Sequence, residues 1–326
     1  MPEEALLKVV NLKKYYPIRK GFFHKVIGYI KAVDGVSLEI PRGKTLGLVG
    51  ESGCGKSTLG YSIARIEKPT SGKIFFEGKD IATCPERELS GIRSEIQMVF
   101  QDSDTSLDPR MNLAEILSEP LRAKGVRKDE IFKRINQLMD NVGLPQKFRD
   151  KYPSELSGGE RQRIGIARAL AMRPKLIICD EPVSALDVSI QAQILNLLKD
   201  LQQEYHLTYL FIAHGLGSVR YVSDRVTVMY LGKIVEAAET FDLFSRPQHP
   251  YTRALLEAYP IPDPTRRNED KMVLYGEIPS PADPPKGCSF HTRCPYASKA
   301  CCSMTPGLKG KGHAVACFKC SQLGGS

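Results

Sequence analysis

Three kinds of feature are absent from this 326-residue sequence, and each absence excludes a class of protein. No stretch of about 18 uncharged apolar residues occurs, so the sequence predicts no membrane-spanning helix. The first residues, Met1-Pro2-Glu3-Glu4, are acidic and lack the basic and apolar regions of a secretory signal, so we expect a cytoplasmic protein. No internal repeat is visible, so we expect one copy of each functional motif.

The composition is that of a folded protein with a basic balance of charge. Hydrophobic residues make up 42% of the chain and charged residues 25%, which excludes a mostly disordered protein. The net charge of +9 is compatible with nucleic acid, anionic lipid or phosphate ligands, but a solvated basic face explains it equally well. Six of the nine cysteines lie between residues 288 and 320, and in a cytoplasmic protein such clustering indicates metal ligation rather than disulfides.

Hydrophobic periodicity predicts an α/β fold with a mostly parallel sheet. Short apolar runs predict strands at residues 6–10, 36–40, 45–49, 73–76, 96–100, 176–179 and 209–213. Apolar residues at helical spacing predict helices over 131–142 and 190–201, and a further helix after residue 156. From residue 241 prolines recur and the periodicity fades. We therefore expect a domain over residues 1–240 and an appended proline- and cysteine-rich module over residues 241–326.

A phosphate-binding motif follows the predicted strand at 45–49. Its residues, which fit G-x-x-x-x-G-K-[ST], are Gly50, Glu51, Ser52, Gly53, Cys54, Gly55, Lys56, Ser57 and Thr58. The glycines allow successive backbone N–H groups to surround phosphate oxygens, while Lys56 supplies positive charge to the β- and γ-phosphates. The Ser57 hydroxyl is available to Mg²⁺. The motif therefore predicts a nucleotide site.

Two carboxylates end the apolar run at 176–179. Asp180 is placed to reach the metal ion, and Glu181 is placed to polarise a water for attack on the γ-phosphate. Acidic residues after a strand are common and usually only solvated, so this element gains its significance from the phosphate motif.

A third motif opens the predicted helix after residue 156. The residues Leu156-Ser157-Gly158-Gly159-Glu160-Arg161-Gln162 place glycines and free N–H groups at a helix N-terminus, which is an anion site. Together with the other two motifs, this one resembles the signature sequence of the ABC transporter ATPases, although Glu160 stands where glutamine is more usual. The resemblance implies a P-loop ABC ATPase fold with a helical subdomain over roughly residues 102–175.

The resemblance also implies roles for residues outside these motifs. Gln101 stands at the Q-loop position and is expected to touch Mg²⁺, and Asp187 belongs to the D-loop. His214 stands at the position of the switch histidine, which is expected to contact the γ-phosphate, and is followed by Gly215 where relatives mostly carry aspartate. Tyr16, beside Tyr15, matches the aromatic residue that stacks on adenine. The residues implied to carry catalysis are Glu181, His214, Gln101 and Lys56, and those implied to hold Mg²⁺ are Ser57, Gln101 and Asp180.

The family binds ATP between two such domains that face each other head to tail. In this picture Ser157 and Gly159 reach the γ-phosphate of an ATP molecule bound to the opposite chain. Gly158, Glu160 and Asp187 would belong to the same surface. The resemblance further implies two membrane permeases and a separate substrate-binding protein as partners, and a peripheral location at the cytoplasmic face of the membrane.

The C-terminal part narrows the resemblance to one branch of the family. Residues 249–256 (HPYTRALL) and 260–264 (PIPDP) resemble the extension of oligopeptide and dipeptide importer ATPases. Residues 14–36 are similar to one of two paralogous ATPase subunits, the F type, which pairs with a related D type, so we expect a heterodimer. Importers of this branch carry peptides, nickel complexes or oligosaccharides, and the ATPase does not contact the cargo.

The same branch carries an iron–sulfur cluster on this extension. The cysteines that match its pattern are Cys288, Cys294, Cys301 and Cys317, and four thiolates at such spacing suit a [4Fe–4S] cluster. Zinc takes the same four thiolates, and unliganded thiols are a third possibility. Cys302 lies beside Cys301, so the choice between these two ligands stays open. Cys320, His291 and His313 are alternative ligands, although the two histidines are expected to be structural.

One alternative to the transporter assignment is an ABC-type ATPase that acts on nucleic acid, which the net charge of +9 would suit. Such proteins usually carry two ATPase cassettes or a long coiled-coil insertion, and this sequence has neither. We therefore expect no nucleic-acid partner.

Overall fold

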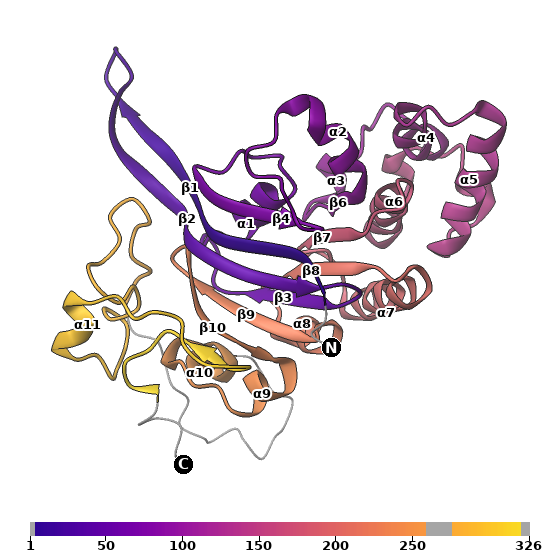
Figure 1. Ribbon diagram of the computed structural model, residues 1–326. Helices are drawn as coiled ribbons and strands as arrows, with labels where there is room; N and C mark the ends of the chain where they lie inside the picture. Colours follow the sequence, from indigo (N-terminus) through magenta and orange to yellow (C-terminus); the bar gives the residue numbers. More distant parts are fainter. Residues whose placement is uncertain (1–3, 259–275, 321–326) are drawn as a thin grey trace.

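The computed structural model describes residues 4–258 and 276–320, which form two sheets surrounded by helices (Figure 1). Within this part of the chain, one sheet has seven strands in the order β11-β10-β9-β3-β8-β7-β6, and the other has four strands in the order β2-β1-β4-β5. Residues 260–264, on which the resemblance partly rests, lie outside the described residues.

The centre of the larger sheet is parallel, as the sequence predicts. Its parallel strands are β9 (Arg225–Tyr230), β3 (Thr45–Val49), β8 (Thr208–Ile212), β7 (Leu176–Asp180) and β6 (Ile96–Val99). Every residue of β3, β7 and β8 is buried. Strands covered on both faces need near-continuous apolar runs, which is why the sequence located them well.

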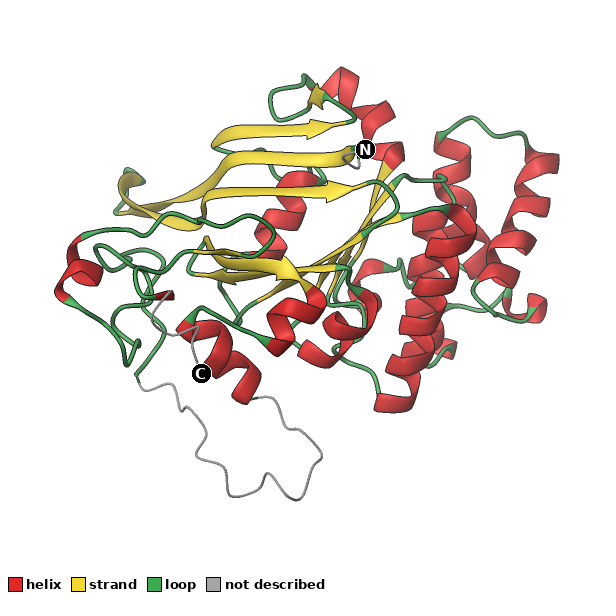
Figure 2. Cartoon of the chain, turned by 60° about the horizontal axis from the view of Figure 1, so that its bottom comes forward, coloured by secondary structure: helices red, strands yellow, loops and turns green. Residues whose placement is uncertain are grey.

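Successive side chains of these strands point to opposite faces of the sheet, so the buried side chains form two separate hydrophobic cores. Leu46, Leu48 and Ile178 face the antiparallel sheet and helix α1 (Lys56–Ile63). Val49 and Ile177 face the opposite side, where α7 (Val188–Tyr205) and α8 (Leu216–Val222) pack. Figure 2 shows the helices on that side of the sheet.

The smaller sheet contains an element that the sequence did not reveal. The predicted strands at 6–10 and 36–40 belong to one long antiparallel hairpin of β1 (Ala5–Lys20) and β2 (Lys25–Pro41), which are 16 and 17 residues long. The sheet is completed by β4 (Ser71–Phe76) and β5 (Lys79–Asp80). Residues 11–35 lack an alternating apolar pattern, and the outer part of the hairpin is instead held by pairing between β1 and β2.

Helices fill the segment between β6 and β7. This segment contains α3 (Ser103–Ser106), α4 (Leu113–Ala123), α5 (Lys128–Asn141) and α6 (Gly158–Leu170), while α2 (Glu86–Glu95) precedes β6. A reciprocal pair of hydrogen bonds between Asn112 and Glu115 fixes the start of α4. The predicted domain limits at residues 102, 175 and 240 stay predictions.

The residues after 240 are more regular than their composition suggests. They include α9 (Thr240–Ser245), α10 (Pro250–Glu257), α11 (Lys299–Ser303) and β11 (Ala314–Val315). Strand β11 pairs with β10 (Lys233–Glu239) and so adds to the larger sheet. Phe290 is 1% exposed and lies in the same core as Tyr230 and Tyr251. Among the helices of residues 4–258 and 276–320, none has the length and the hydropathy that a membrane-spanning segment requires.

Candidate functional site

The phosphate-binding motif forms a tight loop between β3 and α1. Gly50 and Gly55 have φ angles of 156° and 105°, and a Cβ on Gly55 would lie 1.9 Å from the carbonyl oxygen of Ala32, so only glycine fits there. Helix α1 begins at Lys56, whose buried Nζ donates to the carbonyl oxygens of Gly50 and Glu51 at 2.8 and 3.1 Å. The loop therefore holds a cation at the N-terminus of a helix, an arrangement that suits phosphate.

A hydroxyl and a carboxylate meet beside this loop. Ser57 Oγ donates to Asp180 Oδ1 at 3.0 Å, and Asp180 is fully buried at the end of β7. Its other oxygen, Oδ2, has no hydrogen-bond partner in the described structure. Burial raises the pKa of Asp180. A buried carboxylate with a free oxygen beside a hydroxyl has the hard oxygen donors that Mg²⁺ prefers, so these two residues fit that ion.

Glu181 is held by two residues that are distant in sequence. Gln101 Nε2 donates to Glu181 Oε2 at 2.8 Å, and His214 Nε2 lies 2.6 Å from Glu181 Oε1. Burial and the nearby Lys56 ammonium lower the pKa of His214, although the Glu181 carboxylate opposes this shift. The imidazole is therefore neutral at pH 7 and donates its Nε2–H to the carboxylate. The structure thus brings Gln101, Glu181 and His214 together.

The signature residues form a second group at the start of α6. Ser157 caps this helix, and the Glu160 carboxylate accepts hydrogen bonds from both the Ser157 backbone N–H and hydroxyl at 2.7 Å. Gly159 packs against α7, where a Cβ would lie 2.6 Å from the Ile190 side chain. Asp187 occupies the N-cap position of α7, is exposed, and makes no capping hydrogen bond with its side chain. In Figure 1 α6 lies apart from α1, so the signature does not join the loop site of its own chain.

Two further predicted positions have clear surroundings. The Tyr15 hydroxyl donates a hydrogen bond to Asp34, whereas the Tyr16 ring lies under the Lys14 ammonium, 4.8 Å from Nζ to the ring centroid. Gly215 is the N-cap of α8 and has a φ of −76°, so its backbone does not require glycine.

The sequence missed a contact between the C-terminal residues and the phosphate loop. The Arg293 guanidinium donates to Glu51 Oε2 and Oε1 at 2.7 and 3.1 Å, and its side chain is 7% exposed. The Glu51 backbone N–H donates to the Tyr251 hydroxyl at 2.8 Å. These contacts span more than 190 residues of sequence, so no local pattern reveals them.

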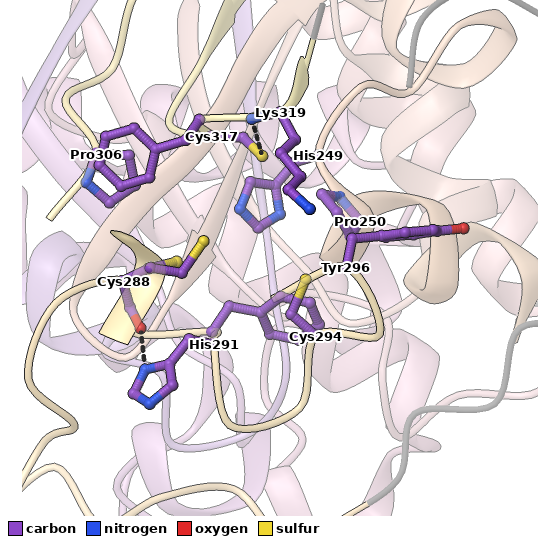
Figure 3. Close-up of a pocket in the computed structure, with 12 residues that line it drawn as sticks. His249, Pro250, Cys288, His291, Cys294, Tyr296, Pro306, Cys317 and Lys319 are labelled. Carbon is purple, nitrogen blue, oxygen red and sulfur yellow. Dashed lines mark hydrogen bonds between the residues drawn. The ribbon is translucent and has the colours of Figure 1, made fainter. Parts of the chain in front are cut away.

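Four of the clustered cysteines line one pocket. The pocket is bordered by Cys288, Cys294, Cys301 and Cys317, and Figure 3 shows the sulfur atoms of the labelled Cys288, Cys294 and Cys317 directed toward its centre. Burial raises the pKa of the Cys288 and Cys317 thiols and raises that of Cys294 to about 11, so the thiols are protonated at neutral pH unless a cation displaces the protons. Cys302 is exposed, and its Sγ is 3.7 Å from the Ser298 carbonyl oxygen.

The predicted metal site is not confirmed by this arrangement. Among the described residues, no group of three or more His, Cys, Asp or Glu side chains could hold a metal ion. The two nearby histidines have other partners: His291 Nδ1 lies 2.8 Å from the Cys288 carbonyl oxygen, and His313 Nε2 lies 2.6 Å from the buried carboxylate of Glu236.

Comparisons with known proteins match both parts of the chain. A family model described as "ABC transporter" matches residues 33–184, and one described as "Oligopeptide/dipeptide transporter, C-terminal region" matches residues 235–301. The oligopeptide transport ATP-binding protein AppF of Bacillus subtilis is 51% identical over 97% of this chain and 97% of its own length. OppF of Salmonella typhimurium, with the same description, is 49% identical over 98% of both chains. A solved dimeric ATP-binding cassette, MJ0796 bound to ADP and Pi, has a TM-score of 0.64 and 29% identity over 72% of this chain and 98% of that one.

Proposed function

Since this chain belongs to the ABC transporter ATPases, we propose that it is the ATP-hydrolysing, energy-coupling subunit of an importer for di- and oligopeptides. One observation carries the proposal: the chain matches proteins named oligopeptide transport ATP-binding proteins at 49–51% identity over nearly its whole length. The convergence of Gln101 and His214 on Glu181 agrees with ATP hydrolysis, because a carboxylate held by two donors is oriented to act on a water molecule.

The chain's own residues divide the work of phosphoryl transfer. The loop N–H groups and Lys56 would hold the phosphates, Ser57, Asp180 and Gln101 would hold Mg²⁺, and Glu181 would accept the proton of the attacking water. When bound, Mg²⁺ neutralises the charge that develops on the phosphates. Gln101 and the neutral His214 fix the two oxygens of Glu181, so the base is in place before the reaction begins.

The signature residues act on a second nucleotide in this proposal. Ser157, Gly158, Gly159, Glu160 and Asp187 would face the ATP of a paralogous ATPase subunit, as a dimeric cassette requires. The structural support is that Ser157 and Asp187 are exposed at the starts of α6 and α7. The pair would work with two permeases at the cytoplasmic face of the membrane and, through them, with a substrate-binding protein. Residues 1–240 would form the ATPase domain and 241–326 its extension.

Glu181→Gln is the variant that tests hydrolysis. It removes the proton acceptor and keeps the shape, so we expect ATP to bind with unchanged affinity while kcat falls by at least about a hundredfold. Glu204→Gln, at an exposed position near the end of α7, is the matched control and should leave kcat unchanged. ATP-driven uptake of a labelled peptide by vesicles that contain the permeases tests import. An active Glu181→Gln variant, or uptake that ignores ATP, would overturn the proposal.

We further propose that Cys288, Cys294, Cys301 and Cys317 hold a [4Fe–4S] cluster. The support is that all four thiols line one pocket, while Cys302 is exposed and outside it. Ligands of a zinc ion must converge on one point, whereas the thiolates of a cubane cluster each bind a different iron and stay farther apart. The lack of a group able to hold a single metal ion among the described residues therefore weighs against zinc more than against a cluster.

Anaerobic purification tests this second proposal. The expected protein is brown and contains about four irons and four sulfides per chain. Cys294→Ser should lose the colour and the iron, and Cys302→Ser, the matched control, should retain both. One zinc per chain, or a colourless protein free of metal, would contradict the cluster and leave the ATPase proposal intact.

A further inference from the structure

The outer end of the β1–β2 hairpin is a two-stranded ribbon that projects from the molecule; we call residues 17–30 the finger. The last residue of β1 that pairs with β4 is Lys13, so beyond it β1 and β2 pair with each other. Figure 1 shows the finger extending away from both sheets. Every residue from 17 to 30 is partly or fully exposed. A two-stranded ribbon of this kind contributes little to the stability of the core, so its exposed residues indicate a role other than folding.

The tip of the finger presents two aromatic rings to solvent. Phe22 and Phe23 are 94% and 91% exposed and pack edge to face with their centroids 5.6 Å apart. Ile27 and Tyr29 follow on β2 and are 58% and 50% exposed. Single exposed apolar residues are ordinary, but a contiguous group on a projecting element indicates a binding surface.

Positive charge surrounds these rings without any negative charge. Arg19 and Lys20 precede the tip, and Lys25 follows it, and all three are exposed. No Asp or Glu occurs anywhere from residue 5 to residue 33. The surface therefore complements an anionic partner.

We propose that the finger docks on an anionic lipid bilayer, with Phe22 and Phe23 inserted below the headgroups and Arg19, Lys20 and Lys25 bound to lipid phosphates. The order of the side chains favours this partner over nucleic acid, because the rings lie beyond the charges. Lys20 and Lys25 pair at the ends of β1 and β2, and Phe22 and Phe23 lie in the turn beyond them. Interfacial elements insert to a depth of roughly 5–10 Å, so the rings of the turn enter the bilayer while the charges of the strand ends stay at the level of the phosphates. A surface for a polyanion such as nucleic acid would instead carry its charges outermost, where they contact the phosphates directly. The contact goes beyond the proposed function, because it needs neither permease nor ATP.

The absence of tryptophan from the chain allows a direct test. Phe23→Trp places a single tryptophan at the tip, and we expect its emission to shift to the blue with vesicles of phosphatidylglycerol and phosphatidylcholine. Lipids with brominated acyl chains should quench it, which reports insertion. Vesicles of phosphatidylcholine alone should have a much weaker effect, because they lack the negative charge. Phe241→Trp on α9, where the phenylalanine is 77% exposed, is the control and should not shift.

Vesicle cosedimentation of the full chain separates the contribution of the aromatic rings to membrane binding from that of the positive charges. Phe22→Ser with Phe23→Ser should lower the partition coefficient by about tenfold or more, and circular dichroism should be unchanged because the rings are exposed. Arg19→Gln with Lys20→Gln and Lys25→Gln should lower it on the order of a hundredfold, from roughly 1 kcal/mol per charge. Neutralising three exposed lysines elsewhere makes the same change in net charge and should have little effect; these are Lys128, Lys133 and Lys147.

Three results would overturn the proposal. The first is a parent chain that does not bind anionic vesicles at low salt. The second is a doubly serine-substituted finger that binds as well as the parent, which would reduce the contact to charge alone. The third is a Phe23→Trp signal that ignores vesicles and responds to RNA or to the assembled permeases, which would make the finger a contact for those molecules.

Discussion

Two adjacent residues of β1, Tyr15 and Tyr16, have opposite surroundings. Neighbouring side chains on a strand point to opposite faces, so only one of the two can face a nucleotide. Tyr15 is bound to Asp34, and burial together with this hydrogen bond raises its pKa well above the ordinary value. Burial and the Asp180 carboxylate raise the pKa of Tyr61, and Tyr16 is a further neighbour of that residue that acts in the same direction. The structure therefore places Tyr16, and not Tyr15, on the side of the phosphate site.

Tyr16→Ala should weaken ATP binding by about tenfold or more, because stacking of a base on an aromatic ring is worth roughly 1–3 kcal/mol. Tyr15→Ala, its matched control, removes the same ring from the opposite face and should change the dissociation constant by less than about threefold. Titration with a fluorescent ATP analogue measures both. Equal losses, or a larger loss for Tyr15→Ala, would show that the nucleotide does not stack on Tyr16.

At the scale of the residue, the sequence indicated which side chains belong to the candidate site but not the hydrogen-bond partners that surround them. The residues Lys56, Ser57, Asp180 and Glu181 follow from two motifs whose spacing is dictated by backbone geometry. The hydrogen bond between Tyr15 and Asp34 depends on the register of a hairpin with several bulges, which no local pattern specifies.

At the scale of the element, the Glu160 carboxylate at the start of α6 has two opposing effects: it caps the helix, and its charge disfavours a phosphate at the same helix end. The Glu160 carboxylate stabilises the helix N-terminus by accepting hydrogen bonds from Ser157. These bonds lower the pKa of Glu160, so its contribution to stability is present above about pH 4.5 and is lost as the pH falls through the lowered value. The carboxylate is therefore charged at neutral pH, where it would repel a phosphate that approaches the same helix end.

Glu160→Gln should tighten ATP-dependent pairing of the cassettes by about two- to fivefold, since a charge at a helix terminus is worth roughly 0.3–1 kcal/mol. Glutamine also completes the capping arrangement, so the midpoint of urea unfolding should change little. Sedimentation with ATP in a hydrolysis-deficient background measures pairing. The control is Glu155→Gln, because Glu155 accepts a similar bond from Tyr152 before α6 begins. Weaker pairing of the Glu160 variant would show that the carboxylate assists the nucleotide.

Burial explains which elements the sequence predicted. The strands at 45–49 and 176–180 are apolar because both of their faces are covered. The sequence did not predict the finger because its residues are exposed and do not pack in a core. It did not predict α4 either, because Pro120 interrupts the usual helical pattern of that segment. Strand β11 is two residues long and depends on pairing with β10, so it carries no periodic signal of its own.

At the scale of the whole molecule, the C-terminal residues brace the phosphate loop. Arg293 lies directly before Cys294 in the cysteine pocket, and its guanidinium forms a bidentate pair with Glu51 of the loop. Tyr251 contacts the backbone of the same loop residue and packs on Phe290. Any change in the pocket that moves Arg293 is therefore transmitted to the loop that holds phosphate. The sequence indicated both the phosphate loop and the cysteine-rich C-terminal residues, but it did not indicate that the two are in contact, since the contact exists only in the folded chain.

Arg293→Gln should raise the KM for ATP several-fold and change kcat less, because it leaves a partly buried Glu51 carboxylate unpaired beside the phosphates. Arg293→Lys keeps the charge but loses the bidentate geometry, so it should recover only part of the affinity. Adding Glu51→Gln to Arg293→Gln removes the unpaired charge, and a coupling energy of about 0.5–3 kcal/mol is expected between the two changes. Arg253→Gln on α10 controls for general loss of stability, because the Arg253 guanidinium donates to the Pro247 carbonyl oxygen at 2.8 Å. If the Arg293 variants lower the melting temperature while KM stays constant, the pair is a structural contact, and the cysteine pocket has no influence on the nucleotide through this route.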